Sequence, residues 1–361
     1  MNNFVTSRIQ NRIGFILLDR PKALNSLSLE MIRSITRTLL DWKNNPAVQA
    51  VCIHGSHERA FCAGGDIRFF YDVGSATPQG DSALLEDFFT EEYALNHLIH
   101  CYPKPYISLL NGVVMGGGMG IAQAGPGNRL RIVTERTKMA MPEVNIGLFP
   151  DVGGGYFLSR CAGELGTWLG LTGEIIHAAD AIYADLADLF VPTDQLAALL
   201  TMLETTQQSD ICSAVRQFAA PFQIVTDPSQ LEKNRAQIDR HFCGNSVAEI
   251  LLSLQADSST FAQQTAAVMQ TRSALMMCVT LEQLRRGRQL TVADCLRMER
   301  VMVRHCFKHG EVLEGVRALV VDKDMQPKWQ PETVAQVSAE MVQAFFAPVW
   351  PDYAHPLRDL G

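Results

Sequence analysis

YISLLNGVVMGGGMG occupies residues 106–120 and joins a short apolar run to a glycine-rich turn. The run 106–110 has the length and composition of a buried strand. If a helix begins at the triplet 116–118, its first N–H groups and the positive end of its dipole suit an anion, or a carbonyl oxygen that becomes negative during a reaction. A tight turn or close helix packing is the alternative, because glycine lets other atoms approach the backbone. The triplet alone favours that alternative.

Two further turns are rich in small residues. FCAGGDI at 61–67 follows the strand-like run 48–53, and Asp66 is suited to fix the turn through side-chain hydrogen bonds. DVGGGY at 151–156 holds a second glycine triplet. Neither triplet contains the GK[ST] of a P-loop or fits the GxGxxG of a dinucleotide site. Turns at the ends of neighbouring strands can converge on one oxygen atom, and the sequence leaves open whether these do.

Strand-like and helix-like patterns alternate along the first half of the chain. Residues 29–42 carry apolar side chains at helical spacing behind Ser28, a candidate N-cap, and residues 86–100 also have a helical pattern. Residues 74–82 have the composition of a loop. Strands that alternate with helices predict a mostly parallel sheet with crossover helices. The strand-like runs are residues 13–18, 48–53, 105–110 and 129–133.

The pattern changes near residue 195. Beyond it the chain carries long amphipathic stretches, at 194–206, 247–254 and 292–306, and few strand-like runs. We therefore predict an α/β fold with two parts. A core at 1–195 would carry the functional site, and 196–361 would form a helical C-terminal region.

Composition narrows the functional classes. The 361 residues are 47% hydrophobic and 19% charged, with a formal net charge of −7. An acidic balance argues against a general nucleic-acid binder, which needs basic surface for phosphates. No run approaches the roughly 18 apolar residues of a membrane span. The nine cysteines include no CxxC pair and favour reduced thiols over disulfides or zinc. The start shows no signal or transit pattern, so a cytoplasmic location is expected.

Three groups of motifs resemble the enoyl-CoA hydratase/isomerase (crotonase) superfamily. The resemblance implies a spiral of ββα units and an acyl-CoA substrate whose thioester oxygen lies between two main-chain N–H groups. By position these are the N–H groups of Gly65 and Gly117. The matching segments are AFCAGGDI at 60–67, NG at 111–112 with GGG at 116–118, and MPE at 141–143 with IG at 146–147.

One branch of the family fits better than the others. The chain is similar to 3-hydroxyisobutyryl-CoA hydrolases, which implies cleavage of a short branched 3-hydroxyacyl-CoA in valine breakdown. Hydratases of the family carry a carboxylate two residues after the first glycine triplet, where this chain has Gly120, and usually a small residue where it has Asp151. The segments that match this branch are EEY at 91–93, GLFPDVGGGYFL at 147–158, EGVRA at 314–318, DKD at 322–324 and PKW at 327–329.

The resemblance assigns roles to three carboxylates. Glu143 would attack the thioester or act as general base on water, and Asp151 would protonate the leaving thiolate or orient the water. Glu92 would contact the 3-hydroxyl group. Apolar neighbours such as Met141 and Leu148 would raise the pKa of Glu143. Binding of the substrate would fall to Glu92, Gly117, Glu143 and Asp151, and catalysis to Gly65, Gly117, Glu143 and Asp151.

Each assignment has a structural alternative. Glu143 could be a surface carboxylate, Asp151 could cap the helix that begins at Gly153, and Glu92 could be a solvated helix residue. Cys62 is better explained as a buried core thiol than as a nucleophile. Four basic residues could meet the CoA phosphates or form a charged rim: Arg20, Lys22, Arg59 and Arg68.

The remaining expectations concern partners and rivals. The pairs His97/His100 and His305/His309 lack a further ligand cluster, so we expect no metal site. No redox cofactor is expected, since CoA is part of the substrate. The expected partner is the acyl-CoA, with no nucleic acid or membrane, and a homo-oligomer is left open. The rival functions are an enoyl-CoA hydratase or isomerase and a non-catalytic acyl-CoA-binding protein.

Overall fold

The computed structural model describes residues 4–77, 82–127, 129–223 and 228–361. The chain divides into two compact units, each built from three segments. Unit 1 comprises Met1–Gly65, Leu95–Ala140 and Ile175–Glu232. Unit 2 comprises Asp66–Ala94, Met141–Glu174 and Lys233–Gly361. Helices α3 (Ala83–His100) and α10 (Gln230–Phe242) contribute residues to both units.

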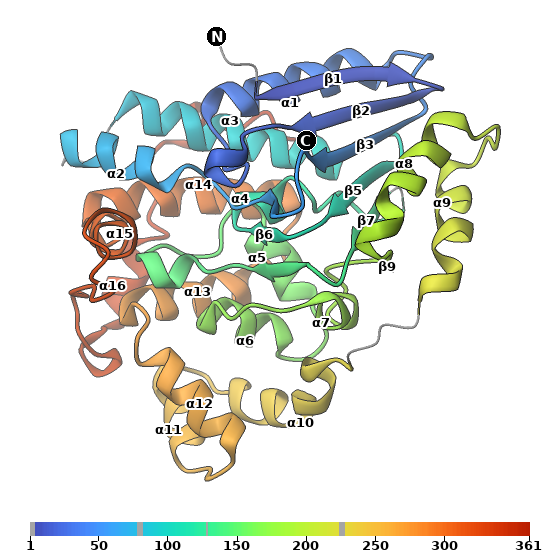
Figure 1. Ribbon diagram of the computed structural model, residues 1–361. Helices are drawn as coiled ribbons and strands as arrows, with labels where there is room; N and C mark the ends of the chain where they lie inside the picture. The colour runs from blue at the N-terminus through green and yellow to red at the C-terminus, as the bar shows by residue number, and fades with distance from the viewer. Residues whose placement is uncertain (1–3, 78–81, 128, 224–227) are drawn as a thin grey trace. The chain divides into compact units, whose positions relative to one another are not determined.

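Unit 1 is organised around a six-stranded sheet (Figure 1). Its strand order is β1-β2-β3-β5-β7-β9, where β1 and β2 are antiparallel and every later pair is parallel. Parallel neighbours need crossover connections, and the helices between the strands supply them. The strands are β1 (Val5–Gln10), β2 (Ile13–Leu18), β3 (Ala50–Gly55), β5 (Tyr106–Leu110), β7 (Arg129–Val133) and β9 (Leu189–Phe190).

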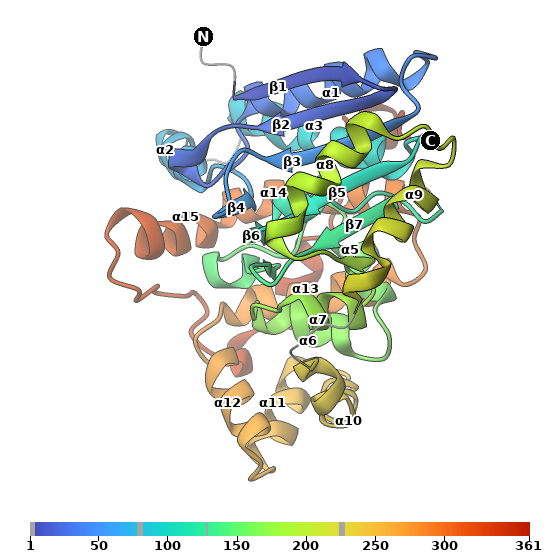
Figure 2. The ribbon, with the colours of Figure 1, turned by 45° about the vertical axis from the view of Figure 1, so that its right-hand side comes forward.

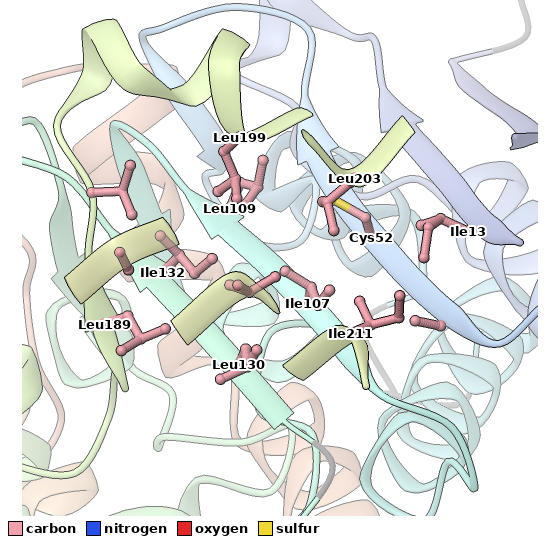
Figure 3. Packing of buried hydrophobic residues seen from close by; sticks show 14 of the residues in the cluster. Ile13, Cys52, Ile107, Leu109, Leu130, Ile132, Leu189, Leu199, Leu203 and Ile211 are labelled. Atoms are coloured by element: carbon pink, nitrogen blue, oxygen red, sulfur yellow. The ribbon is translucent and has the colours of Figure 1, made fainter. Parts of the chain in front are cut away.

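Both faces of this sheet are covered by helices of unit 1. Side chains alternate along a strand, so Ile13 and Phe15 of β2 point to one face and Gly14 to the other. Helices α8 (Leu196–Thr205) and α9 (Ile211–Ala219) cover the first face, as Figure 2 shows, with Leu199, Leu203 and Ile211 in the core of Figure 3. Helix α1 (Leu29–Lys43) covers the second face, where Trp42 fills the space above Gly14.

A smaller parallel sheet in unit 1 positions the first glycine triplet. Its strands are β4 (Ala60–Cys62), β6 (Val113–Met115) and β8 (Lys138–Ala140), in the order β4-β6-β8. Helix α4 (Gly117–Gly120) begins directly after β6. The remaining helix that lies wholly in unit 1 is α7 (Ala178–Tyr183).

Among its described residues, unit 2 contains helices and no β-strand. Helix α13 packs against α5, α6 and α16, and α14 packs against α5 and α15. Ser273 caps α13 and Thr291 caps α14, each by accepting a main-chain N–H three residues on. The helices are α2 (Ile67–Ala76), α5 (Gly154–Phe157), α6 (Leu165–Thr172), α11 (Val247–Gln255), α12 (Thr260–Met269), α13 (Ala274–Gly287), α14 (Val292–His309), α15 (Glu311–Val316) and α16 (Ala339–Ala344).

Most predicted elements are confirmed, with two differences. The predicted loop 74–82 is partly wrong, because residues 74–76 end α2; residues 78–81 lie outside the described part of the chain. The predicted division at 195/196 does not coincide with the two units. Helices α8 and α9 lie beyond residue 195, yet their apolar faces pack on the sheet of unit 1. Among the described residues, no helix is long and apolar enough to cross a membrane.

Candidate active site

The two predicted glycine turns of unit 1 lie against each other. They follow β4 and β6, which are hydrogen-bonded neighbours. A Cβ atom on Gly118 would lie 2.2 Å from the carbonyl oxygen of Cys62, and one on Gly64 would lie 3.1 Å from that of Met115. Gly64 also has a φ of +102°, which side chains rarely tolerate. Glycine is therefore required here for close packing, as the structural alternative predicted.

The same turn also leaves main-chain donors available. Helix α4 begins at Gly117, so the condition set for the triplet, that a helix begins there, is met. The first N–H groups of a helix have no acceptor within it. The N-cap Gly116 has no side chain to accept them. Gly65 follows Gly64, whose carbonyl accepts the N–H of Leu27 at 2.7 Å. The structure thus brings the two turns together, and their role as oxyanion donors stays a prediction.

Unit 2 holds a cluster of buried carboxyl groups. Glu92 lies on α3, Glu143 begins the 3-10 helix η2 (Glu143–Ile146), and Asp151 lies in the turn before α5. Their exposed fractions are 2%, 5% and 5%. A fourth, Glu299 on α14, is fully buried. The alternatives of a surface Glu143 and a solvated Glu92 are therefore wrong.

Burial and mutual repulsion raise the pKa values of this cluster. Burial raises the pKa of Glu143 well above its ordinary value, and the negative charge of Asp151 adds to this effect. The same two causes raise the pKa of Glu92. Burial raises the pKa of Asp151 to about 6, against the hydrogen bond from Tyr93, which lowers it. The increase predicted for the pKa of Glu143 is confirmed.

Glu143 and Glu92 each keep a carboxyl oxygen without a protein partner. Oε2 of Glu143 and Oε1 of Glu92 are buried and accept no hydrogen bond from the described residues. Buried polar atoms are rarely left in this state, and an orphan commonly marks a group reserved for a ligand or for water. Both atoms belong to residues that the sequence assigned to the substrate.

The loop that carries Glu143 is held from the C-terminal part of unit 2. Ser273 donates its main-chain N–H to the carbonyl of Val144 at 3.2 Å, and its hydroxyl contacts Glu311 at 2.6 Å. Helix α15 lies so close that a Cβ on Gly147 would be 2.4 Å from the carbonyl oxygen of Glu311. The sequence block near residue 314 thus supports the loop of Glu143.

Asp151 is fixed by Tyr93, which sequence reasoning did not assign. The Tyr93 hydroxyl donates to Oδ2 of Asp151 at 2.7 Å, and both residues are buried. The Asp151 side chain does not cap α5, so the capping alternative is wrong. Its main-chain carbonyl instead accepts the N–H of Gly154 at 2.7 Å. The carboxyl group is therefore available for chemistry.

The side chain that caps α5 is Glu299, which sequence reasoning also missed. Its Oε2 accepts the N–H of Gly153 at 2.7 Å, and its Oε1 accepts that of Gly155 at 2.9 Å. Gln283 of α13 donates to Oε1 of Glu299 at 3.1 Å and to the carbonyl of Pro150 at 2.7 Å. One feature of the sequence could have indicated this role. Glu299 lies on the apolar face of the stretch 292–306, where an unpaired charge is costly.

The other candidates take ordinary structural places. Cys62 is buried, with its sulfur 3.8 Å from the Gly64 carbonyl oxygen. Arg20 donates to the carbonyl of Ser26 at 3.0 Å, and Arg68 pairs with Asp72 at 3.0 Å. Within the described ranges, no group of three or more His, Cys, Asp or Glu side chains is placed to hold a metal ion.

The predicted site residues therefore fall into two groups. Gly65 and Gly117 belong to unit 1, whereas Glu92, Glu143 and Asp151 belong to unit 2. The two glycine turns are therefore described within unit 1, and the buried acids within unit 2. Donors for an oxyanion and acids for proton transfer are the two requirements of acyl transfer.

The chain is similar to named proteins over most of its length. The chain is 39% identical over 337 residues to a protein of Xenopus laevis named 3-hydroxyisobutyryl-CoA hydrolase, mitochondrial, with 92% of this chain and 86% of the relative covered. A human protein of the same name is also 39% identical, with the same coverage. These relatives extend over both units.

Solved structures agree on the fold. A structure titled as a carnitinyl-CoA dehydratase from Mycobacterium thermoresistibile shares 39% identity, with a TM-score of 0.89 and coverage of 97% of this chain and 98% of that one. The fold is therefore the crotonase-type α/β fold, with a helical C-terminal region. The model of the enoyl-CoA hydratase/isomerase family matches residues 13–346, and the chain belongs to that family.

Proposed function

We propose that this protein hydrolyses a short branched 3-hydroxyacyl-CoA of the 3-hydroxyisobutyryl-CoA type. Water and the thioester would give the free 3-hydroxy acid and CoA, a step of valine breakdown. The names of the relatives, at 39% identity over most of both chains, support this substrate. The observation that carries the proposal is the pair of buried acids, Glu143 and Asp151, in a chain that has Gly120 where hydratases carry a carboxylate.

The first chemical requirement is stabilisation of the oxyanion. As a nucleophile attacks the thioester carbon, its oxygen becomes negative, and preformed N–H donors lower the barrier. We assign this role to the main-chain N–H groups of Gly65 and Gly117. Removal of one such donor typically costs on the order of 10²–10³ in turnover.

The second requirement is a nucleophile. Glu143 fits it in either of two ways, since its Oε2 is buried without a protein partner. As a nucleophile it would form a mixed anhydride and expel the CoA thiolate, and water would then cleave the anhydride to release the acid. As a general base it would take a proton from the water that attacks the thioester directly.

Asp151 and Glu92 complete the proposed site. A pKa of about 6 lets Asp151 hold a proton over part of the physiological range and give it to the departing thiolate. Its ionised form would instead orient the attacking water. Glu92 keeps Oε1 free of protein partners, and we assign it to the 3-hydroxyl group of the acyl chain. That contact would select 3-hydroxy over unsubstituted acyl groups.

The proposed reaction needs neither metal nor redox cofactor, because hydrolysis of a thioester transfers no electrons and CoA is part of the substrate. The proposed partner is the acyl-CoA, with no nucleic acid or membrane, and a homo-oligomer remains open. None of the nine cysteines forms a disulfide, which fits a reducing compartment. We propose the cytoplasm, although the names of the relatives place those proteins in mitochondria.

A hydratase or isomerase is the second candidate, favoured by the titles of similar structures. Besides the dehydratase above, a structure titled as an enoyl-CoA hydratase from Rhodobacter sphaeroides shares 36% identity, with a TM-score of 0.86 and coverage of 96% of this chain and 98% of that one. Hydration in this family uses two glutamates around one water, and Gly120 removes one of them. We therefore rank hydrolysis first.

A thiol-release screen tests the proposal. Short acyl-CoAs with and without a 3-hydroxyl group are incubated with the protein, and free CoA is followed with a thiol reagent. We expect the fastest release from 3-hydroxyisobutyryl-CoA and little loss of enoyl absorbance from unsaturated acyl-CoAs. Loss of enoyl absorbance without CoA release would favour the hydratase. No turnover of any substrate would favour a binding protein.

A further inference from the structure

The turn of residues 150–155 adopts a conformation that needs external support. Val152 has a φ of +53°, a region that β-branched side chains avoid, and Gly153 follows at +90°. Val152 is also buried, so the surrounding residues hold it in this conformation. Asp151 lies directly before this strained pair, and any relaxation of the turn would move its carboxyl group.

Glu299 supplies that support from a helix 146 residues further along the chain. Its two oxygens accept the N–H groups of Gly153 and Gly155, and Gln283 links the same carboxylate to the carbonyl of Pro150. A Cβ on Gly155 would lie 3.0 Å from Oε1 of Glu299, so the carboxylate is in direct contact with the turn. All three hydrogen-bond partners are donors, which suits the ionised form.

The charge of Glu299 also acts on the cluster. Burial raises the pKa of Glu299, and its three donors oppose that change. Its negative charge in turn raises the pKa of Glu143. The titratable groups that interact with it are Tyr93 of α3, Glu143 of η2, Asp151 of the turn and Cys295 of α14.

We propose that Glu299 is a positioning residue of this site: its carboxylate holds turn 150–155 by two main-chain hydrogen bonds and so keeps Asp151 bonded to Tyr93. Glu299 does not touch the reacting atoms. Nothing in its role requires the substrate to be 3-hydroxyisobutyryl-CoA, but its effect on turnover rests on the proposed hydrolysis. The main-chain N–H groups of the second glycine triplet thus bind the carboxylate of Glu299.

Glu299→Gln separates positioning from simple stability. Glutamine offers one acceptor oxygen, so one of the two N–H groups loses its partner. A misplacement of about 1 Å can cost on the order of 10² in rate, so we expect kcat to fall about 10- to 100-fold, with KM within about twofold. Burial raises the pKa of Glu299 to about 8, and where it is ionised the loss of its charge lowers the pKa of Glu143, so the acid limb of kcat against pH should move to lower pH.

Three companion variants define the cause. Glu299→Asp keeps the charge at a shorter reach, so kcat should fall less and the acid limb should stay in place. Gln283→Met removes one hydrogen bond to Glu299 and one to the Pro150 carbonyl but no charge, so kcat should fall about 3- to 10-fold with the limb in place. Glu282→Gln removes a charge from the neighbouring position, where the side chain pairs with Arg286 at 2.8 Å, and should leave kcat, KM and the limb unchanged.

Hydrogen exchange gives a readout that needs no substrate. In Glu299→Gln one of the two amides, that of Gly153 or that of Gly155, loses its acceptor, and we expect it to exchange about 10-fold faster or more. Faster exchange with lower kcat and a shifted limb supports the inference. If the amides of the variant exchange at the wild-type rate, the inference is overturned. It is also overturned if kcat falls only in proportion to the melting temperature and the acid limb does not move. If the wild-type protein releases no CoA, the proposed hydrolysis fails and the exchange result alone decides the role of Glu299.

Discussion

The two glycine triplets of this protein begin helices in the same way and differ in what accepts their first N–H groups. Glycines 116–118 of unit 1 and 153–155 of unit 2 each place a positive-φ glycine at the N-cap of a four-residue helix. At α5 the exposed donors are taken by the carboxylate of Glu299. At α4 the N-cap Gly116 offers no side-chain acceptor.

This difference distinguishes a turn that is held by the protein itself from one whose N–H groups can bind a ligand. Exposed helix N–H groups need an acceptor, and an internal carboxylate provides a permanent one. A turn closed in this way is rigid and can carry a catalytic acid beside it. A turn left open can receive a substrate oxygen. Identical composition therefore does not fix function, and the presence or absence of a buried acid opposite the turn does.

The largest expected effect is that of Glu143→Gln, which removes a buried acid of unit 2. The amide cannot act as nucleophile or general base, so CoA release should fall by at least about 10²–10⁴. Binding of the CoA ester should survive. A thiol assay with titration calorimetry measures both. Turnover close to that of wild type would remove Glu143 from the mechanism.

Paired alanine substitutions compare the two turns directly. In Gly118→Ala the new Cβ would meet the main-chain oxygen of Cys62 at 2.2 Å, so α4 must move and its donors with it. We expect a loss of about 10²–10³ in kcat. In Gly155→Ala the nearest atom is a side-chain oxygen of Glu299 at 3.0 Å, which can shift, so the loss should be near 10-fold.

A larger loss of kcat in Gly155→Ala than in Gly118→Ala would contradict the distinction between the two turns. Equal melting temperatures for the pair would show that kcat, and not folding, carries the difference. A loss of kcat in Gly118→Ala that is matched by a rise in KM would show that the α4 turn binds the ground state and transition state alike.

Asp151→Asn should lower the rate of hydrolysis and raise the free energy of unfolding at pH 8. Burial raises the pKa of Asp151 from 3.8 to about 6. A raised pKa contributes stability below pH 4, and this contribution is lost as the pH rises through about 6. At pH 8 the wild-type protein has lost about 3 kcal/mol, which the neutral amide does not lose. Denaturant unfolding at pH 4 and pH 8 measures the difference.

Turnover and stability should therefore change in opposite directions in this variant. Hydrolysis at pH 8 should slow by about 10² or more, with little change in binding. An Asp151→Asn variant that is less stable than wild type at pH 8 would show that the carboxyl is held by favourable contacts of its charge, against the direction of its pKa. Unchanged hydrolysis would remove Asp151 from the mechanism.

Tyr93→Phe should give the smallest effect and distinguish the two roles of Asp151. The hydroxyl stabilises the ionised carboxylate, so its removal raises the pKa of Asp151 above about 6. If Asp151 acts as the protonated acid, the basic limb of kcat should move to higher pH. If it acts ionised, the acid limb should move to higher pH. One hydrogen bond is worth about 1 kcal/mol, so kcat near neutral pH should change about fivefold.

Local sequence patterns predicted the elements that local physics determines. The β2 and β7 runs, helix α1 with its Ser28 cap, and the helix start at the first glycine triplet all depend on residues close in sequence. Burial of Glu143 also followed from its apolar neighbours. In these cases periodicity, capping and turn chemistry agree with the final structure.

Contacts between distant segments could not be predicted in this way. The hydrogen bond between Glu299 and Gly153 joins residues 146 positions apart, and that between Tyr93 and Asp151 joins residues 58 apart. The division into two units interleaves three segments of each, so no linear boundary describes it. A buried glutamate on an apolar helix face signals that a partner exists, and only the fold identifies which one.

The most direct test of the proposed function is the ratio of CoA release to enoyl hydration in the wild-type protein. Free thiol from 3-hydroxyisobutyryl-CoA and loss of enoyl absorbance from a matched short enoyl-CoA are measured at the same enzyme concentration. We predict that kcat/KM for thiol release exceeds that for hydration by at least about 10³. Rapid hydration with no release of thiol would contradict the hydrolase assignment.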